Sequence, residues 1–103
     1  MALDFAMVNS TGNIYSNVPI NIELHGEIFD KMESGKYRLL EKIRDYYSDV
    51  TFMNAELVEL KDEMVLLAES HSSNIKHLEL LQSMVQLVNE ATERDLQIEV
   101  IAD

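Results

Sequence analysis

The chain has 103 residues, about the size of one domain, and carries 8 lysines and arginines against 19 aspartates and glutamates, for a net charge of −11. This charge excludes ordinary nucleic-acid binding, which needs clustered cations on the phosphates. With 47% hydrophobic residues and a single proline, the composition predicts one folded domain over residues 1–103.

The sequence contains no cysteine, which excludes disulfides, thiolate nucleophiles and metal sites with cysteine ligands. No apolar run is long enough to span a bilayer, and anionic lipid would repel so acidic a surface. The first residues, Met1 to Val8, lack the basic residues of a secretory signal and include Asp4. We therefore expect a cytoplasmic protein without a membrane partner.

A short strand is predicted near the N-terminus. Leu3, Phe5 and Met7 occupy alternate positions, a period that is typical of strands. Turn-forming residues fill positions 9–13, and a second short extended segment is expected over Asn13–Pro19. A further strand is predicted near the C-terminus, where the apolar residues again alternate. Because an isolated short strand is unstable, we expect the two terminal strands to pair with each other.

Helical periodicity accounts for most of the remaining chain. Asn21 is a suitable N-cap for the first predicted helix and Gly35 a suitable stop. The other helices are predicted from about Tyr37 to Ser48, from Asn54 to a break at Ser70–Ser73, and from about Asn74 to Glu93. The expected fold is α+β and mostly α: a four-helix domain in which the N- and C-terminal strands pair in a small sheet.

No motif for catalysis, metal binding or cofactor binding is evident. Glycine-rich phosphate loops and the nucleophile elbow of hydrolases are absent. His25, His71 and His77 are not spaced as metal ligands on one helix face, so we expect half-buried histidines held by hydrogen bonds. The prediction is a protein that is not an enzyme and uses no metal and no cofactor.

The acidic residues of the third predicted helix form the most informative pattern. They lie opposite its apolar stripe, with Leu66 in their midst, and comprise Glu56, Glu59, Asp62, Glu63 and Glu69. One interpretation is the charged outer face that any surface helix shows. The other is a binding surface on which like charges attract a basic protein and Leu66 provides an apolar anchor. The sequence leaves both open.

A second candidate is the segment from Asp45 to Asp49, where acidic residues flank two tyrosines. Asp45, Tyr47 and Asp49 are candidate partner-binding residues, because a tyrosine buries its ring while its hydroxyl stays paired. The alternative is that the rings pack inward. The nearby cations, Lys36, Arg38, Lys42 and Arg44, are too few for a nucleic-acid site and are expected to pair with neighbouring acids.

Several segments resemble small bacterial immunity proteins of polymorphic-toxin and contact-dependent growth-inhibition systems. They are the opening Leu3-Asp4-Phe5-Ala6-Met7-Val8, the stretch Val18-Pro19-Ile20 before a helix with His25, the segment from Leu39 to Asp49, and the closing Ile98-Glu99-Val100-Ile101-Ala102-Asp103. The resemblance implies a cytoplasmic inhibitor that binds one cognate toxin domain, often a nuclease, in a 1:1 complex.

The charge agrees with this expectation, because a nuclease holds phosphates with lysines and arginines that carboxylates can cover. The residues alone leave two alternatives to an inhibitor of a toxin. The chain is an acidic adaptor or nucleic-acid mimic with another basic protein partner, or it is an enzyme whose site shows no recognisable motif.

Overall fold

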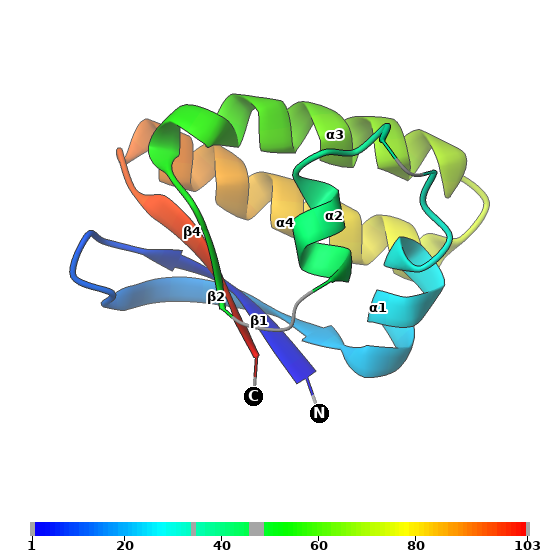
Figure 1. Cartoon of the computed structure of the whole chain (residues 1–103), viewed down its shortest axis with the longest axis horizontal. Coiled ribbons are helices and arrows are strands. Elements are labelled where there is room, and N and C mark those ends of the chain that lie inside the picture. The colour runs from blue at the N-terminus through cyan, green and yellow to red at the C-terminus, as the bar shows by residue number, and fades with distance from the viewer. Residues whose placement is uncertain (1, 34, 46–48, 103) are drawn as a thin grey trace.

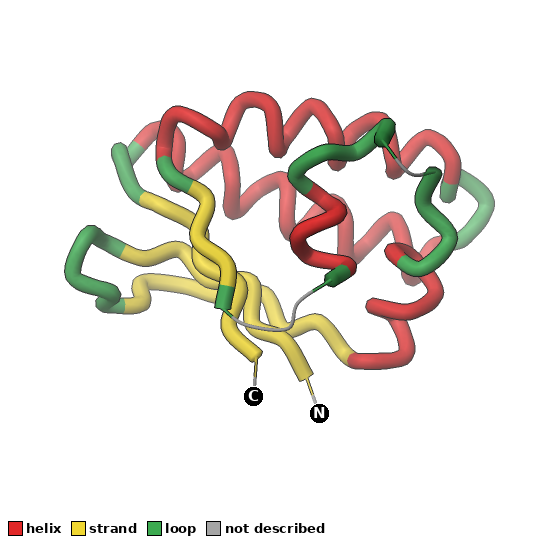
Figure 2. The backbone as a smooth tube through the Cα atoms, in the orientation of Figure 1, coloured by secondary structure: helices red, strands yellow, loops and turns green. Residues whose placement is uncertain are grey.

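The computed structural model describes residues 2–33, 35–45 and 49–102. Its four strands are β1 (Ala2–Val8), β2 (Ile14–Asn21), β3 (Val50–Phe52) and β4 (Gln97–Ala102). Its helices are α1 (Ile22–Phe29), α2 (Leu40–Arg44), the 3-10 turn η1 (Asn54–Glu56), α3 (Leu57–Ser70) and α4 (Ile75–Glu93). The strands form one antiparallel sheet in the order β2-β1-β4-β3, and α3 and α4 run along one side of it (Figures 1 and 2).

The two terminal strands form the centre of the sheet. Phe5 of β1 pairs with Val100 of β4, and alternate residues of both strands point into a shared core. Burial on this face explains the period-2 apolar pattern of both segments. The helices complete the core with buried stripes that include Leu60 and Met64 of α3 and Met84 of α4.

The hairpin between β1 and β2 follows from a cluster of turn-forming residues. The Asn9 side chain accepts hydrogen bonds from the backbone N–H groups of Thr11 (3.0 Å) and Asn13 (2.9 Å). Gly12 has φ +86°, a conformation that residues with a side chain rarely adopt. The chain therefore returns along β1 and places β2 at the sheet edge.

The predicted four-helix domain with a sheet of only the terminal strands is wrong. β2 and β3 come from the middle of the chain and widen the sheet to four strands. The extended segment expected over Asn13–Pro19 is in fact the eight-residue strand β2, which follows β1 across the hairpin. β3 has three residues, too few to show a period in the sequence, and it pairs with β4 through Phe52 and Ile98.

Two helices are shorter than predicted. α1 ends at Phe29 instead of continuing to Gly35, and α2 covers Leu40–Arg44 within the expected range of 37–48, of which residues 46–48 lie outside the described part of the chain. Asn21 is the N-cap of α1 as predicted, since its side chain accepts a hydrogen bond from the N–H of Leu24 (3.0 Å). Within the described part of the chain, no helix combines the length and apolar character needed to cross a membrane.

Candidate interaction surface

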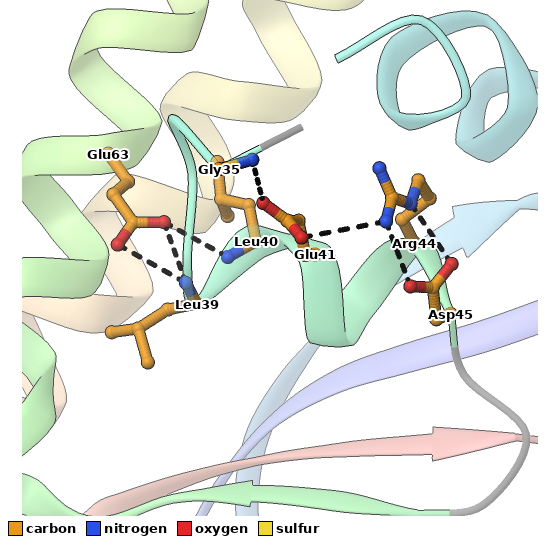
Figure 3. A network of polar contacts seen from close by, with 7 residues as sticks. All are labelled: Gly35, Leu39, Leu40, Glu41, Arg44, Asp45 and Glu63. Carbon is orange, nitrogen blue, oxygen red and sulfur yellow. Dashed lines mark hydrogen bonds and ion pairs between the residues drawn. The ribbon is translucent and has the colours of Figure 1, made fainter. Parts of the chain in front are cut away.

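Glu63 joins α3 to the start of α2. Its carboxylate accepts hydrogen bonds from the backbone N–H groups of Leu39 (2.9 Å) and Leu40 (3.0 Å), as Figure 3 shows. The first N–H groups of a helix have no partner within the helix, so this carboxylate caps α2 from outside. Glu63, a predicted partner-binding residue, thus has a structural role in this fold.

Two more of the predicted acids are also occupied within the chain. Glu59 forms an ion pair with Arg38 at the surface. Glu56 accepts a hydrogen bond from the backbone N–H of Met53 (3.0 Å) at the start of η1. The predicted acids therefore do not form one free surface. Glu59 and Glu63 face α2 and the residues just before it, whereas Asp62 and Glu69 face outward.

The second candidate segment is only partly described. Asp45 makes a two-point contact with Arg44 (2.9 and 3.0 Å), which lowers the pKa of the Asp45 carboxyl and raises that of the Arg44 guanidinium (Figure 3). Asp49 accepts a hydrogen bond from the N–H of Ala102 (3.2 Å). Tyr47 lies outside the described residues. Asp45 and Asp49 therefore both have intramolecular partners.

Two of the four cations around α2 pair with acids, as predicted, whereas the two lysines lie over aromatic rings. Arg38 and Arg44 pair with acids, as described above, and Lys42 lies 6.0 Å from the centre of the Phe52 ring. Lys36 lies 5.7 Å from the centre of the Tyr37 ring. These contacts connect α2 and the described residues just before it to α3 and β3.

The outer side of α3 combines apolar and acidic residues. Val58 is 61% exposed, Val65 44% and Leu66 39%. Asp62 and Glu69 are exposed on the same side, and neither carboxylate forms a hydrogen bond or ion pair with another described residue. Of the predicted site residues that the structure describes, Asp62 and Leu66 thus remain available to a partner.

A groove runs between α3 and α4 beside this outer side. It has a volume of about 330 Å³ and is lined by Val65, Ala68, Leu81, Gln82, Val85 and Gln86. Asp62 and Glu69 flank it on α3, and Glu79 precedes Gln82 by three residues on α4, one helical turn away. Lys61 lies four residues before Val65 on the same side of α3, so the border also carries a cation. The result is an apolar groove with a mostly acidic border.

The sequence held an indication of this groove that the prediction missed. Val58 and Val65 are seven residues apart, so they share a face of α3 outside its buried stripe. Val85 and Gln86 lie on the matching side of α4. Which two helices face each other is a property of the tertiary structure, and so the groove itself could not be located in advance.

The histidines are held by hydrogen bonds, as predicted. His25 is buried, with Nε2 2.8 Å from the carbonyl oxygen of Ile43. His77 lies with Nε2 3.0 Å from Glu27 and Nδ1 2.9 Å from Nδ1 of His71. Among the described residues, no group of three or more histidines, aspartates or glutamates is arranged to hold a metal ion.

The contact between His71 and His77 predicts a dependence of stability on pH. Burial, and secondarily the charge of His77, lower the pKa of His71 below its usual 6.5. As the pH falls, His71 is therefore protonated in the unfolded chain before it is protonated in the folded protein. The free energy of unfolding is expected to fall as the pH drops below about 6.5. Urea denaturation from about pH 7.5 to about pH 5.5 measures the slope. In the His71→Gln protein, the free energy of unfolding should depend less on pH. An unchanged slope would contradict the role of His71.

Comparison of the chain with protein-family models, with curated proteins and with solved structures gives no match.

Proposed function

We propose that this protein is an immunity-type inhibitor that neutralises a basic toxin domain by binding it in a 1:1 complex. The observation that carries the proposal is the apolar groove between α3 and α4, with the unpaired acids Asp62 and Glu69 at its border. The net charge of −11 adds a long-range attraction to any basic partner. The similarity of several segments to bacterial immunity proteins favours a toxin as that partner.

In this mechanism, charge governs association and apolar contact governs dissociation. The negative surface speeds the encounter with a cationic domain and orients it. Val65 and Leu66 then lose their contact with water in the complex, which slows dissociation. If the toxin is a nuclease, the carboxylates lie against the lysines and arginines that would otherwise hold phosphate. No covalent step is involved.

Co-expression with a toxin domain, sought first among the products of the neighbouring genes, tests the proposal directly. The expected result is rescue of growth together with recovery of a 1:1 complex. A stable complex with a basic protein that is not a toxin would favour the alternative, an acidic adaptor or nucleic-acid mimic. Turnover of a substrate by the isolated protein would instead reveal an enzyme.

The role of the outer side of α3 is tested by the double substitution Asp62→Lys and Leu66→Ala. We expect the dissociation constant for the toxin to rise at least about tenfold, because the change reverses one charge and removes one anchor. Both side chains are exposed, so the free energy of unfolding should change by less than about 1 kcal/mol. Calorimetric titration measures the affinity.

The matched control is Glu33→Lys, a charge reversal of an exposed acid in the segment after α1. Its on-rate should change modestly, since the net charge changes, but its off-rate should stay the same. If the control and the double variant weaken binding equally, the outer side of α3 is not the interface. An association rate that ignores salt would remove the electrostatic part of the mechanism.

A further inference from the structure

The outer edge of β2 is free. In the order β2-β1-β4-β3, β2 has β1 on one side, and none of the described residues forms a strand on its other side. Figure 1 shows β2 at the border of the sheet, below α4. An edge strand presents backbone N–H and C=O groups to which another strand can pair. β2 offers eight residues, Ile14–Asn21, for such pairing.

The register of the hairpin identifies which backbone groups point outward. Pro19 is paired with Asp4, and proline has no N–H to donate to β1. This pair is therefore one of those without backbone hydrogen bonds, which alternate with bonded pairs in an antiparallel ladder. Asn17, two residues earlier and paired with Ala6, has the same orientation. The N–H and C=O of Asn17 and the C=O of Pro19 are thus directed away from the sheet.

β2 lacks the charged residues that usually protect an edge. None of its eight residues is charged, and Ile14 and Tyr15 are both more than half exposed. Pro19 removes one donor, so it limits pairing at the C-terminal part of the strand. The pairing with β1 also shifts at Tyr15, because Met7 pairs with Ser16 and Val8 with Ile14, so the regular part of the free edge runs from Ser16 to Val18.

A groove lies beside this edge, between β2 and α4. It has a volume of about 510 Å³ and is lined by Ser16, Val18, Ser83, Gln86, Leu87, Asn89, Glu90 and Glu93. Two of these residues are acidic and none is basic. Arg94, which follows α4, lies 5.0 Å from the centre of the Tyr15 ring and 3.8 Å from Glu90. The carboxylate of Glu93 makes no hydrogen bond or ion pair with another described residue.

We infer that the free edge of β2 receives an extended, basic segment of the toxin domain as an added strand. This inference rests on the proposed function and specifies how part of the partner binds. Side chains of a strand alternate between its two faces, so every second residue of the added strand lies on the side of α4. Lysines or arginines at those positions meet Glu90 and Glu93, while backbone hydrogen bonds to Asn17 set the register.

The charge of the groove favours a basic strand over a second copy of this chain as the occupant. Two copies paired through β2 would bring their acidic grooves together, with Glu90 and Glu93 from each and a net charge of −11 on each. The same charges attract a basic strand. The groove therefore favours a different, cationic chain over self-association.

A peptide in which lysine and threonine alternate is the probe for strand addition. Titrated into the intact, isotope-labelled protein, it should shift the amide resonances of Ser16 and Asn17 and slow hydrogen exchange of the Asn17 N–H at least about tenfold. Two control peptides share its length. One carries N-methyl groups on alternate backbone nitrogens, and the other has glutamate in place of lysine. Equal binding of the N-methylated peptide would overturn strand addition, and equal binding of the glutamate peptide would overturn the charge argument.

Variants then connect the edge with the toxin. Asn17→Pro removes the outward N–H without removing a bond to β1, and Asn17→Ala is its control, because it removes only the side-chain contact with Asp4 (3.0 Å). We expect Asn17→Pro and Glu93→Lys each to weaken toxin binding at least about tenfold, and Asn17→Ala to weaken it less than about threefold. Urea denaturation of each variant shows that it is folded.

The outcomes separate the two proposals. If the unmodified protein forms the toxin complex but both variants bind as tightly as it does, the edge is not used and the inhibitor function stands. If no toxin complex forms while the lysine peptide still protects Asn17, the edge binds basic strands and the toxin is the wrong partner. Dimerisation of the free protein that Asn17→Pro abolishes would identify a second copy as the occupant and overturn the inference.

Discussion

Replacing Phe52 by alanine is expected to lower the free energy of unfolding by about 3–5 kcal/mol, the usual cost of removing a fully buried aromatic ring. Phe52 has no exposed surface, although it lies on the short edge strand β3. β3 contributes only three residues to the sheet, so its position depends strongly on this side chain. Urea denaturation followed by circular dichroism measures the change.

Thr51→Ala is the matched control. Thr51 is the next residue on β3, it points to the opposite face and it is exposed. Its replacement should change the free energy of unfolding by less than about 0.5 kcal/mol. Hydrogen exchange adds a local test, because the Phe52→Ala protein should lose protection in β3 and the adjacent side of β4 first. A loss of less than about 1 kcal/mol in Phe52→Ala would show that the core does not depend on β3.

Replacing Glu63 by alanine is expected to lower the free energy of unfolding by about 1.5–3 kcal/mol, the range for hydrogen bonds to a charged group. The carboxylate satisfies two N–H groups at the start of α2, and alanine leaves both without that partner. α2 has only five residues and its N-cap residue, Leu39, has no side chain able to replace the acceptor. Equilibrium denaturation measures the loss.

Asp62→Ala provides the comparison for Glu63→Ala. It removes the same negative charge from the neighbouring position of α3, but Asp62 is exposed and caps nothing. We expect its effect to stay within about 0.5 kcal/mol. Glu63→Gln should fall between the two alanine variants, because the amide oxygen still accepts a hydrogen bond without a charge. Equal losses in Glu63→Ala and Asp62→Ala would mean that charge alone matters.

The elements that were predicted well carry their own local signals. α4 has a broad apolar stripe and an N-cap at Asn74, whose side chain accepts a hydrogen bond from the N–H of His77 (3.1 Å). β1 and β4 alternate because one face of each packs on the helices. In these segments local preference and tertiary packing agree, so the pattern in the sequence was sufficient to find them.

The missed features depend on contacts between distant residues. α2 begins only at Leu40, where its first N–H groups are capped by Glu63, which lies more than twenty residues further along the chain. The apolar residues Leu39, Leu40 and Ile43 predicted a longer second helix. They are buried in the common core, but the helix that carries them has only five residues. Glu59 and Glu63 were expected on a free surface because a helical wheel shows the face of a helix but not its neighbours.

The pairing of β1 with β4 has a consequence for the order of folding. The two central strands lie at opposite ends of the described chain, and Figure 1 shows those ends side by side. The β1–β2 hairpin is local and can form while the rest of the chain is being made, but β3 has no partner strand until β4 has emerged from the ribosome. Such distant pairing slows folding. The sheet is therefore completed only after synthesis of β4, and until then the side of β1 that β4 will cover stays open to other strands.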